Sequence, residues 1–476
     1  MNTKTCHLTI VGGGITGLSA AFYLHREMEA KGLPVQFQLI EEQERLGGKI
    51  RTWRHDGYVI ELGPDSFLER KPSAAQLAKD LRLGDQLVRN STGQSYIWHR
   101  DRLMPIPQGA VYGVPTRLKP FLTTELISWP GKLRAAADLV LPASKVEGDR
   151  SVGQFFRRRL GDEVVDNLIQ PLLSGVYSGD MDNLSLLASF PQFAEWEKQH
   201  RSLIQAMKHS RPKTGSKEQP KGIFLSLKNG LESLIEGMEA RLPAESIWKG
   251  TRLAEVARSE TGRYRLVMKD GRVLETDAIL FTTPHSVTET LLRPYVELPA
   301  LPQAKPHMVA TIAMGFPEEA VELGLEGTGF IVPRNAGATI TACTWVHRKW
   351  PHMVPPGKAV LRCFIGRATE QEFLQWTDEE IVERALHDLR KIMAIHQEPE
   401  FARVTRLQNA IPYVVGHQQW VLDVEKAVQR ELPGIWLAGA SYRGVGVPDC
   451  IDQGKKAASA FLASVHESAE KVALLT

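Results

Sequence analysis

The sequence predicts an α/β protein in which a parallel-sheet nucleotide-binding domain carries other domains inserted within it. Two observations indicate this class. A buried strand, a glycine-rich loop and a helix open the chain, and a glycine-rich segment of a similar kind returns after residue 438. In addition, 476 residues are too many for one hydrophobic core, so we expect two or three domains.

The first 40 residues have the spacing of a βαβ unit. Residues 7–11 are a short apolar run that ends on glycines, which is typical of a buried parallel strand. Residues 15–30 place apolar side chains on one stripe and predict a helix. Pro34 ends that helix, and residues 35–40 predict the second strand.

Gly12, Gly14 and Gly17 fit the pattern GxGxxG between this strand and this helix. Glycine allows the tight turn and the close approach of a pyrophosphate, which the N–H groups of a helix N-terminus bind. Glu41 follows the second strand, where a carboxylate accepts hydrogen bonds from ribose hydroxyls, although it could be an exposed acid beside Glu42. The motif alone does not separate FAD from NAD.

Two later segments favour FAD. Residues 45–49 place two glycines between Arg45 and Lys49, so that backbone N–H groups and cations could bind the same pyrophosphate; a basic turn is the alternative. Residues 439–449 lead into a helix expected from about Gln453, whose positive end would face the flavin, where negative charge develops on reduction. Residues 63–66 could run beside the flavin ring or form an ordinary turn.

The rest of the chain alternates between helical and strand patterns. Residues 72–220 turn helical, and 208–221 are polar and basic, as in an exposed connection. Two strands joined by an Asp-Gly turn are expected over 264–276, followed by a buried strand from residue 278. Further patterns predict strands within 307–367, a helix near 378–396 and a strand within 432–438.

Composition excludes several classes of protein. A net charge of +3 gives no sign of a nucleic-acid partner, and the four cysteines lack the CxxC spacing of zinc sites and suggest reduced thiols in a cytoplasmic protein. His347 and His352 have no zinc-ligand spacing, and we expect no metal. No apolar run reaches the length of a membrane span, and no hydrolase constellation stands out.

The three glycine segments resemble those of the flavoprotein superfamily that includes monoamine oxidases, phytoene desaturases and protoporphyrinogen oxidases. Residues 151–187 (SVGQFFRRRLGDEVV and onward) are similar to the helical domain of the porphyrinogen-oxidising branch. The stretch from ELGPDSFLERK and the ending GVGVPDCIDQGKKAA are similar to its Firmicute-type members, the coproporphyrinogen III oxidases. The resemblance extends over nearly the whole chain.

This resemblance implies a fold and an activity. The fold would be monoamine-oxidase-like: a Rossmann-like FAD-binding domain (1–71, 221–295 and 405–476), a mainly helical domain (72–220) that could face a membrane, and an α+β substrate-binding domain (296–404). The activity would be oxygen-dependent oxidation of coproporphyrinogen III to coproporphyrin III in haem biosynthesis, with protoporphyrinogen IX as the alternative substrate. Six electrons would leave in three flavin cycles, each of which releases hydrogen peroxide.

The resemblance also implies which residues bind. The FAD contacts would be Gly12, Gly13, Gly14, Ile15, Thr16, Gly17, Glu41, Glu42, Gly48, Lys49, Gly63, Pro64, Asp65, Ser66, Leu253, Gly446, Val447 and Pro448. Substrate contacts would be Lys71, facing a propionate, and Phe330, Ile331 and Phe364, around the macrocycle. Lys71 could equally be an exposed lysine, and the other three plain core. No protein side chain is expected to be catalytic, because hydride passes to the flavin N5 atom.

Two positions depart from the family pattern, and other functions stay open. Lys49 stands where relatives often have arginine, and Leu407 where close relatives can have tryptophan. The alternatives are a flavin amine oxidase or carotenoid desaturase, although Leu407 and Tyr442 make no evident aromatic cage, and a non-catalytic dinucleotide-binding scaffold. Peripheral membrane contact at the inner face of the cell membrane and transient contact with other haem-pathway enzymes are further expectations.

Overall fold

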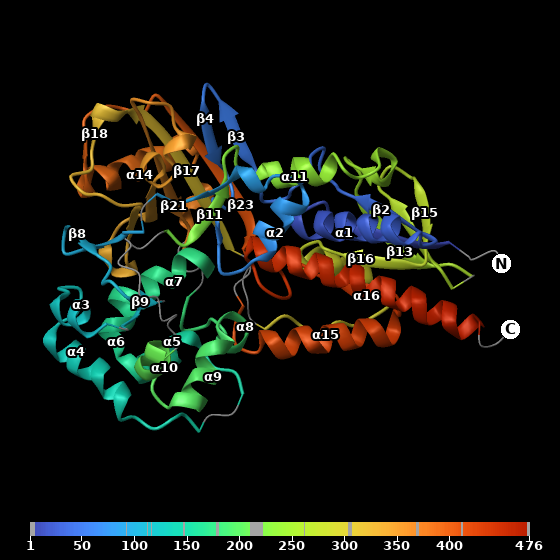
Figure 1. Cartoon of the computed structure of the whole chain (residues 1–476), viewed down its shortest axis with the longest axis horizontal. Helices are drawn as coiled ribbons and strands as arrows, with labels where there is room; N and C mark the ends of the chain where they lie inside the picture. Colours follow the sequence, from blue (N-terminus) through green and yellow to red (C-terminus); the bar gives the residue numbers. More distant parts are fainter. Residues whose placement is uncertain are drawn as a thin grey trace.

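The computed structural model describes residues 5–91, 93–111, 113–115, 117–145, 148–177, 180–209, 222–260, 262–302, 307–367, 371–410 and 413–473. Most of the predicted exposed connection at 208–221 lies outside these residues. Figure 1 shows three groups of elements: a sheet with α14 at the upper left, helices α3–α10 at the lower left, and a layered α/β unit that includes both ends of the chain at the right.

The α/β unit is built on a five-stranded parallel sheet, which confirms the predicted fold class. Its strand order is β12-β2-β1-β16-β24, and every neighbouring pair is parallel. The predicted strand at 35–40 has the expected bounds. The strand expected over 278–284 begins at residue 278 but ends at Phe281, and the strand expected at 7–11 begins one residue earlier. The strands are β1 (Cys6–Val11), β2 (Val35–Ile40), β12 (Ile247–Trp248), β16 (Ala278–Phe281) and β24 (Ile435–Leu437).

Successive side chains of these buried strands point to opposite faces, so each face has its own core. Leu8, Ile10 and Leu39 pack against α1 (Ile15–Lys31), α2 (Ser73–Asp80), α11 (Glu232–Glu239) and α16 (Val447–Ala473). Val11 and Ile40 pack on the other face. That second core includes α12 (His285–Leu292), α15 (His417–Glu431) and a small sheet of β13 (Leu253–Arg258), β14 (Tyr264–Met268) and β15 (Val273–Thr276).

The predicted Asp-Gly hairpin is present as β14 and β15. Gly271 has φ +87°, the left-handed conformation for which glycine is the favoured residue. Helix α15 was not predicted, and α16 begins at Val447, six residues before the expected position. Pro448 explains that early start, because proline is well tolerated in the first turn of a helix.

A seven-stranded sheet forms the second group, in the order β23-β17-β21-β20-β19-β7-β8. One face packs on α14 (Asp378–Ile392), which Thr377 and Glu380 cap by a reciprocal pair of hydrogen bonds. The strands are β7 (Tyr96–His99), β8 (Arg102–Pro105), β17 (His307–Pro317), β19 (Gly329–Ile331), β20 (Ile340–Trp345), β21 (Lys358–Ile365) and β23 (Phe401–Ala410), and α13 (Val346–Lys349) follows β20.

The pattern over 72–220 does not stay helical, because β7 and β8 form a hairpin and join this sheet. Arg100 and Asp101 link the two strands with φ of 50° and 58°. Such turns normally carry glycine or asparagine, so the sequence gives no hairpin signal here. Short strands accompany them: β5 (Phe67–Leu68), β6 (Leu87–Arg89), β9 (Ala110–Val111) and β10 (Val114–Pro115), with β11 (Phe224–Leu227) between β5 and β6.

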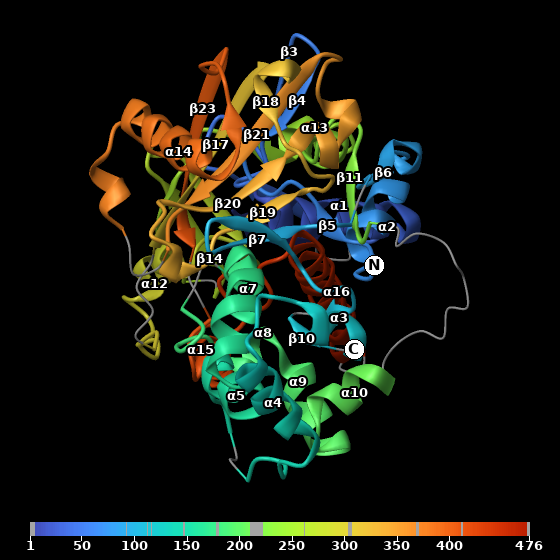
Figure 2. The ribbon, with the colours of Figure 1, turned by 90° about the vertical axis from the view of Figure 1, so that its left-hand side faces the viewer.

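The other described residues of this stretch are mainly helical and have their own core around Phe155, Phe156 and Phe193. Figure 2 shows these helices below the seven-stranded sheet, with α7 rising toward β7 and β19. They are α3 (Leu118–Thr123), α4 (Trp129–Ala136), α5 (Val152–Leu160), α6 (Asp162–Val164), α7 (Gln170–Tyr177), α8 (Leu186–Ser189), α9 (Pro191–His200) and α10 (Leu203–His209). Within the described residues, no helix is both long enough and apolar enough to cross a membrane.

Candidate functional site

The loop between β1 and α1 has the shape of a phosphate cradle. Gly12 has φ +109°, and a Cβ atom at Gly17 would stand 2.0 Å from the carbonyl oxygen of Gly12, so both positions require glycine. Helix α1 begins directly after Gly14, and a Cβ atom at Gly14 would have no protein atom within 4 Å. Open space therefore lies in front of a helix N-terminus, as a pyrophosphate group needs.

Glu41 lies at the end of β2 with its carboxylate turned toward this loop. One oxygen accepts a hydrogen bond from Gly13 N at 2.7 Å, and the other accepts one from Gln43 N at 2.9 Å. The carboxylate is thereby oriented beside the cradle, which fits a ribose-binding role. Glu42 is exposed and lies 3.9 Å from Arg252, and the Leu253 side chain belongs to the core behind β1 and β2.

The second glycine segment joins the first one directly. Gly47 N donates to Gly13 O at 2.8 Å, and a Cβ atom at Gly48 would come within 3.4 Å of Gly14 Cα. Arg45 donates to the carbonyl oxygens of Leu46, Gly48 and Ile50, so this guanidinium shapes the loop itself. The Lys49 side chain is solvent-accessible, yet the surrounding protein lowers its pKa by desolvation.

The third segment, 439–449, closes against the same cradle. Gly439 follows β24, and its N–H donates to Gln453 Oε1 at 3.0 Å. A Cβ atom at Gly454 would stand 2.3 Å from Thr16 O, so α16 packs on α1 at the distance that only glycine allows. Gly446, Val447 and Pro448 thus form the start of α16 beside the N-terminus of α1. Two segments from the first 50 residues therefore meet a third that begins at residue 439.

Loop 63–66 is fixed by two cations that sequence reasoning missed. Gly63 O accepts a hydrogen bond from Arg362 of β21, which is buried, and Asp65 Oδ2 accepts one from Lys349 Nζ of α13 at 2.6 Å. Burial alone would raise the pKa of Asp65, but the charges of Lys349 and Arg362 hold it well below its usual value. Ser66 Oγ donates to the same carboxylate at 2.7 Å.

A second buried carboxyl lies just before this loop. Glu61, on β4 (Tyr58–Glu61), is 4% exposed and accepts hydrogen bonds from Leu231 N at 2.6 Å and Thr52 Oγ1 at 2.9 Å; Thr52 opens the neighbouring strand β3 (Thr52–His55). Desolvation raises its pKa to about 7, although both hydrogen bonds and Arg362 act in the opposite direction. Pro64 lies in the same loop as Asp65 and Ser66. Arg362 and Lys349 hold this loop through Gly63 O and the Asp65 carboxylate, and the buried Glu61 lies just before it.

Lys71, the expected propionate ligand, is paired within the protein. Its Nζ atom lies 2.7 Å and 2.6 Å from the two carboxylate oxygens of Asp449, in the first turn of α16. The lysine side chain is 41% exposed and that of the aspartate 27%, so solvent reaches both groups. Lys71 therefore lies at the edge of the site, and its role toward substrate stays a prediction.

The three expected macrocycle contacts do not share one face of the sheet. Phe330 is 2% exposed and packs in the core against α14, with Trp345 as its ring neighbour. Ile331, next along β19, points to the other face, because side chains alternate along a strand. Phe364 lies on that other face too, since Ala342 is the register partner of both Ile331 and Phe364.

We call this other face of the seven-stranded sheet the site face. Thr311, opposite Phe364, belongs to it and donates to Leu62 O at 3.2 Å, so the site face borders the loop that begins at Gly63. Phe364 is half-buried, and the Arg362 guanidinium lies 4.8 Å from its ring centroid. The site face carries half-buried apolar side chains along five strands: Val309, Ile331, Ala342, Phe364 and Leu407.

The sequence analysis did not predict Arg362 and Lys349 as site residues, although the sequence around Arg362 indicates that it is unusual. Arg362 interrupts an otherwise apolar run, residues 359–365 of β21, and a lone cation in such a run indicates a buried partner. Lys349 follows His347 and Arg348 in an ordinary basic stretch, so the sequence gives no reason to single it out.

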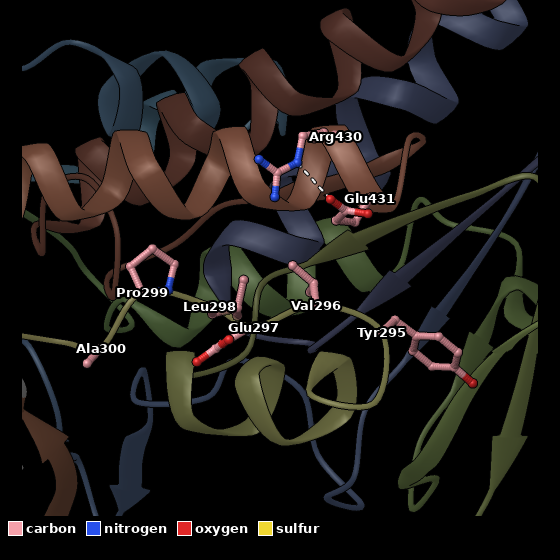
Figure 3. A pocket seen from close by; sticks show the side chains of 8 residues that line it. All are labelled: Tyr295, Val296, Glu297, Leu298, Pro299, Ala300, Arg430 and Glu431. Carbon is pink, nitrogen blue, oxygen red and sulfur yellow. Dashed lines mark hydrogen bonds and ion pairs between the residues drawn. The ribbon is translucent and has the colours of Figure 1, made fainter.

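A hollow on the surface lies away from these residues. Figure 3 shows it between residues 295–300 and the end of α15, with Arg430 and Glu431 joined by a 2.7 Å hydrogen bond. None of the predicted binding residues lines this hollow.

Comparison with known proteins agrees with the geometry. The family model for flavin containing amine oxidoreductases matches residues 15–462. The chain is 48% identical over 461 residues to a coproporphyrinogen III oxidase of Bacillus subtilis, with 95% of this chain and 97% of that protein covered. It is 41% identical to the coproporphyrinogen III oxidase of Staphylococcus aureus, with 97% of this chain and 100% of that protein covered. It is 31% identical to a chloroplastic protoporphyrinogen oxidase of Spinacia oleracea, with 97% of this chain and 85% of that protein covered.

Solved structures show the same fold. A putative protoporphyrinogen oxidase from an Exiguobacterium species superposes with a TM-score of 0.86 at 41% identity, covering 96% of this chain and 99% of the other. A UDP-galactopyranose mutase superposes with a TM-score of 0.69 at 16% identity, covering 96% of each chain, which is a likeness of fold alone.

The cradle, the oriented Glu41 carboxylate and the start of α16 fit FAD, which is the cofactor of this family. The residues that would hold it are those of 12–17, 41, 47–49, 63–66 and 446–448. The chain belongs to the flavin-containing amine oxidoreductase family, on the branch that holds the coproporphyrinogen III oxidases.

Proposed function

We propose that this protein oxidises coproporphyrinogen III to coproporphyrin III, with three molecules of oxygen consumed and three of hydrogen peroxide formed. The similarity to two coproporphyrinogen III oxidases along almost their whole length carries the proposal. Protoporphyrinogen IX is the second candidate substrate, because relatives named protoporphyrinogen oxidases are about as fully covered at 28–32% identity.

The site face suits a flat, largely apolar macrocycle. Val309, Ile331, Ala342, Phe364 and Leu407 expose apolar side chains toward the side on which loop 63–66 lies. Bound FAD supplies the hydride acceptor. The protein then has to hold the macrocycle flat against the cofactor and keep water out, and apolar side chains do both without offering competing proton donors.

Loop 63–66 provides a rigid edge for that arrangement. Arg362 donates to Gly63 O, and Lys349 donates to the Asp65 carboxylate, so the loop is tied to β21 of the seven-stranded sheet and to α13. Lys349 is paired with the Asp65 carboxylate, and Arg362 lies within electrostatic reach of Asp65 and Glu61.

An amine oxidase function receives no support from the two aromatic-cage positions. Tyr442 is buried between His285 and Trp420, and its ring is stacked on Trp420 with the ring planes 5° apart. Leu407 lies on β23 opposite Val309. Tyr442 therefore belongs to the core that contains Val11 and Ile40, whereas Leu407 lies half-buried on the site face of the seven-stranded sheet.

The direct test is an aerobic assay of the purified holoenzyme with each porphyrinogen, following porphyrin fluorescence and peroxide. We expect faster turnover of coproporphyrinogen III, with three peroxides for each porphyrin. A yellow protein inert to both porphyrinogens would overturn the proposal.

Lys71 is proposed to bind a substrate propionate at the edge of the site. Because Lys71 is already paired with Asp449, a propionate would compete for it. Lys71→Ala should raise KM for coproporphyrinogen III, which has four carboxylates, with FAD content unchanged. An unchanged KM would dismiss this role.

Peripheral contact with the inner face of the cell membrane is proposed through α3 and α4. Trp129 and Leu133 of α4 are 64% and 73% exposed, Leu118 of α3 is 73% exposed, and Val140, four residues after α4, is 75% exposed. Exposed Arg117 and Lys119 flank Leu118 and would contact anionic lipid headgroups.

Co-sedimentation with vesicles of phosphatidylglycerol and phosphatidylcholine tests this contact. Replacing both Trp129 and Leu133 by serine should reduce binding, whereas Leu325→Ser, at a separate exposed leucine, should not. Equal binding of both variants would contradict the proposal. Passage of product to another haem-pathway enzyme is a further proposal, to be tested by adding that enzyme to the assay.

A further inference from the structure

The ion pair between Lys71 and Asp449 connects two segments that meet at the cofactor. Lys71 follows β5 and loop 63–66, and its backbone N–H donates to Leu68 O at 3.0 Å. Asp449 is the third residue of α16, directly after Pro448. The pair spans 378 positions of sequence, so only the tertiary fold brings it together.

The Asp449 carboxylate lies back against the glycine segment before α16. A Cβ atom at Gly444 would come 2.6 Å from Asp449 Cβ, and one at Gly446 would come 2.9 Å from its Oδ2 atom. Both positions are therefore glycine because this carboxylate occupies the adjacent space. The negative charge thus contacts the segment that would hold FAD.

The other charges of the site are close by. Burial raises the pKa of the neighbouring Cys450 thiol to about 11, and the charges of Asp449, Lys49 and Lys71 all act on that thiol. Lys49 belongs to the second glycine segment, so the pair lies within electrostatic reach of the cradle itself.

We propose that Lys71 and Asp449 act as a positioning pair that sets the electrostatic potential at the start of α16 and so the reduction potential of bound FAD. A helix N-terminus carries about +0.5 charge. Asp449 adds −1 and Lys71 restores +1, which leaves about +0.5. Reduction brings electrons onto FAD, so a more positive surrounding favours the reduced form. The inference concerns the cofactor alone and holds whichever porphyrinogen is the substrate.

Single and double substitutions separate this role from that of a mechanical latch. Lys71→Met changes the local sum to about −0.5, Asp449→Asn changes it to about +1.5, and the double variant returns it to about +0.5. If the ion pair only holds the two segments together, either single substitution removes it to the same extent, and the double substitution does not restore it. Opposite shifts of the potential in the two single variants would come from charge.

The experiment is a measurement of the midpoint potential of each holoenzyme against a redox dye, with FAD content measured alongside. We expect a lower potential in Lys71→Met, a higher one in Asp449→Asn, and values near wild type in the double variant and in Lys71→Arg. Should Lys71→Met fail to hold FAD, Asp449→Asn and the double variant still differ by the Lys71 charge, and the double variant should have the lower potential.

Three results would overturn the inference. Shifts of the same sign in both single variants would indicate a latch. Unchanged potentials with full FAD content would mean that the charges are screened by solvent. Loss of FAD from Asp449→Asn, where the site becomes more positive, would show that the contact matters for folding and not for charge.

Discussion

Replacing Glu61 by glutamine should change how the stability of this protein depends on pH. Glu61 lies 4% exposed between β3 and α11 and accepts hydrogen bonds from Leu231 N and Thr52 Oγ1. Glutamine keeps the size of the side chain and an acceptor oxygen but has no charge to bury. The comparison therefore isolates the cost of ionising this carboxyl group inside the protein.

The magnitude follows from the pKa. Desolvation raises the pKa of Glu61 from 4.5 to about 7 in the folded protein, and such a change corresponds to about 3 kcal/mol. Below about pH 4.5 the group is protonated in both the folded and the unfolded state. Between pH 4.5 and 7 the carboxyl group is ionised in the unfolded chain but still protonated in the folded protein. Ionisation therefore stabilises the unfolded chain alone over this range, and the free energy of unfolding falls as the pH rises.

Urea-induced unfolding of wild type and Glu61→Gln at several pH values measures the effect. The free energy of unfolding of the variant, relative to wild type, should rise by about 3 kcal/mol between pH 4.5 and 7.5. Glu255→Gln removes an exposed carboxylate on β13 and serves as the control for the loss of one carboxyl group. A relative stability of Glu61→Gln that stays constant, or falls as the pH rises, would refute the reasoning.

Three further substitutions test the cradle, the loop and the sheet. Gly17→Ala should yield a colourless protein in absorption spectra, because its Cβ atom would stand 2.0 Å from Gly12 O and displace the FAD-binding loop. Asp65→Asn should lower the free energy of unfolding by about 3 kcal/mol, measured by urea unfolding, since it leaves the Lys349 charge without its partner. Phe330→Ala should cost about 3–5 kcal/mol in the same measurement, as a large side chain leaves the core.

Each of these has a matched comparison. Gly14→Ala places its Cβ atom in open space, so the protein should fold normally, and any loss should be of FAD alone. Adding Lys349→Met to Asp65→Asn should recover part of the lost stability; no recovery would mean that the pair is not what fails. Phe364→Ala should alter KM for the porphyrinogen more than stability, and a larger effect on stability than on KM would contradict the place given to Phe364 on the site face.

Much of the nucleotide-binding unit could be predicted because its signals are local. The strand at 35–40, the hairpin turn at Gly271 and the loop 12–17 follow from neighbouring residues: an apolar run, an Asp-Gly pair, and glycines whose absent side chains the backbone requires. The resemblance to flavoproteins then supplied the cofactor, which the family match confirms.

Other features had no local signal at all. The hairpin of β7 and β8 turns through Arg100 and Asp101 in a conformation that these residues rarely adopt, so nothing in the sequence predicts it. Apolar character placed Phe330 and Ile331 together, whereas the pleat of β19 separates them onto opposite faces.

The sequence by itself indicated the glycine-rich segments and the class of fold, because short motifs and local periodicity carry that information, and the resemblance to flavoproteins indicated the family. Only the tertiary structure decided which charges meet. Lys71 with Asp449, Lys349 with Asp65, and Arg362 with Gly63 O join positions between 284 and 378 residues apart. The residues next to either member of such a pair do not indicate its partner, because the contact forms only when segments far apart in the sequence pack against one another.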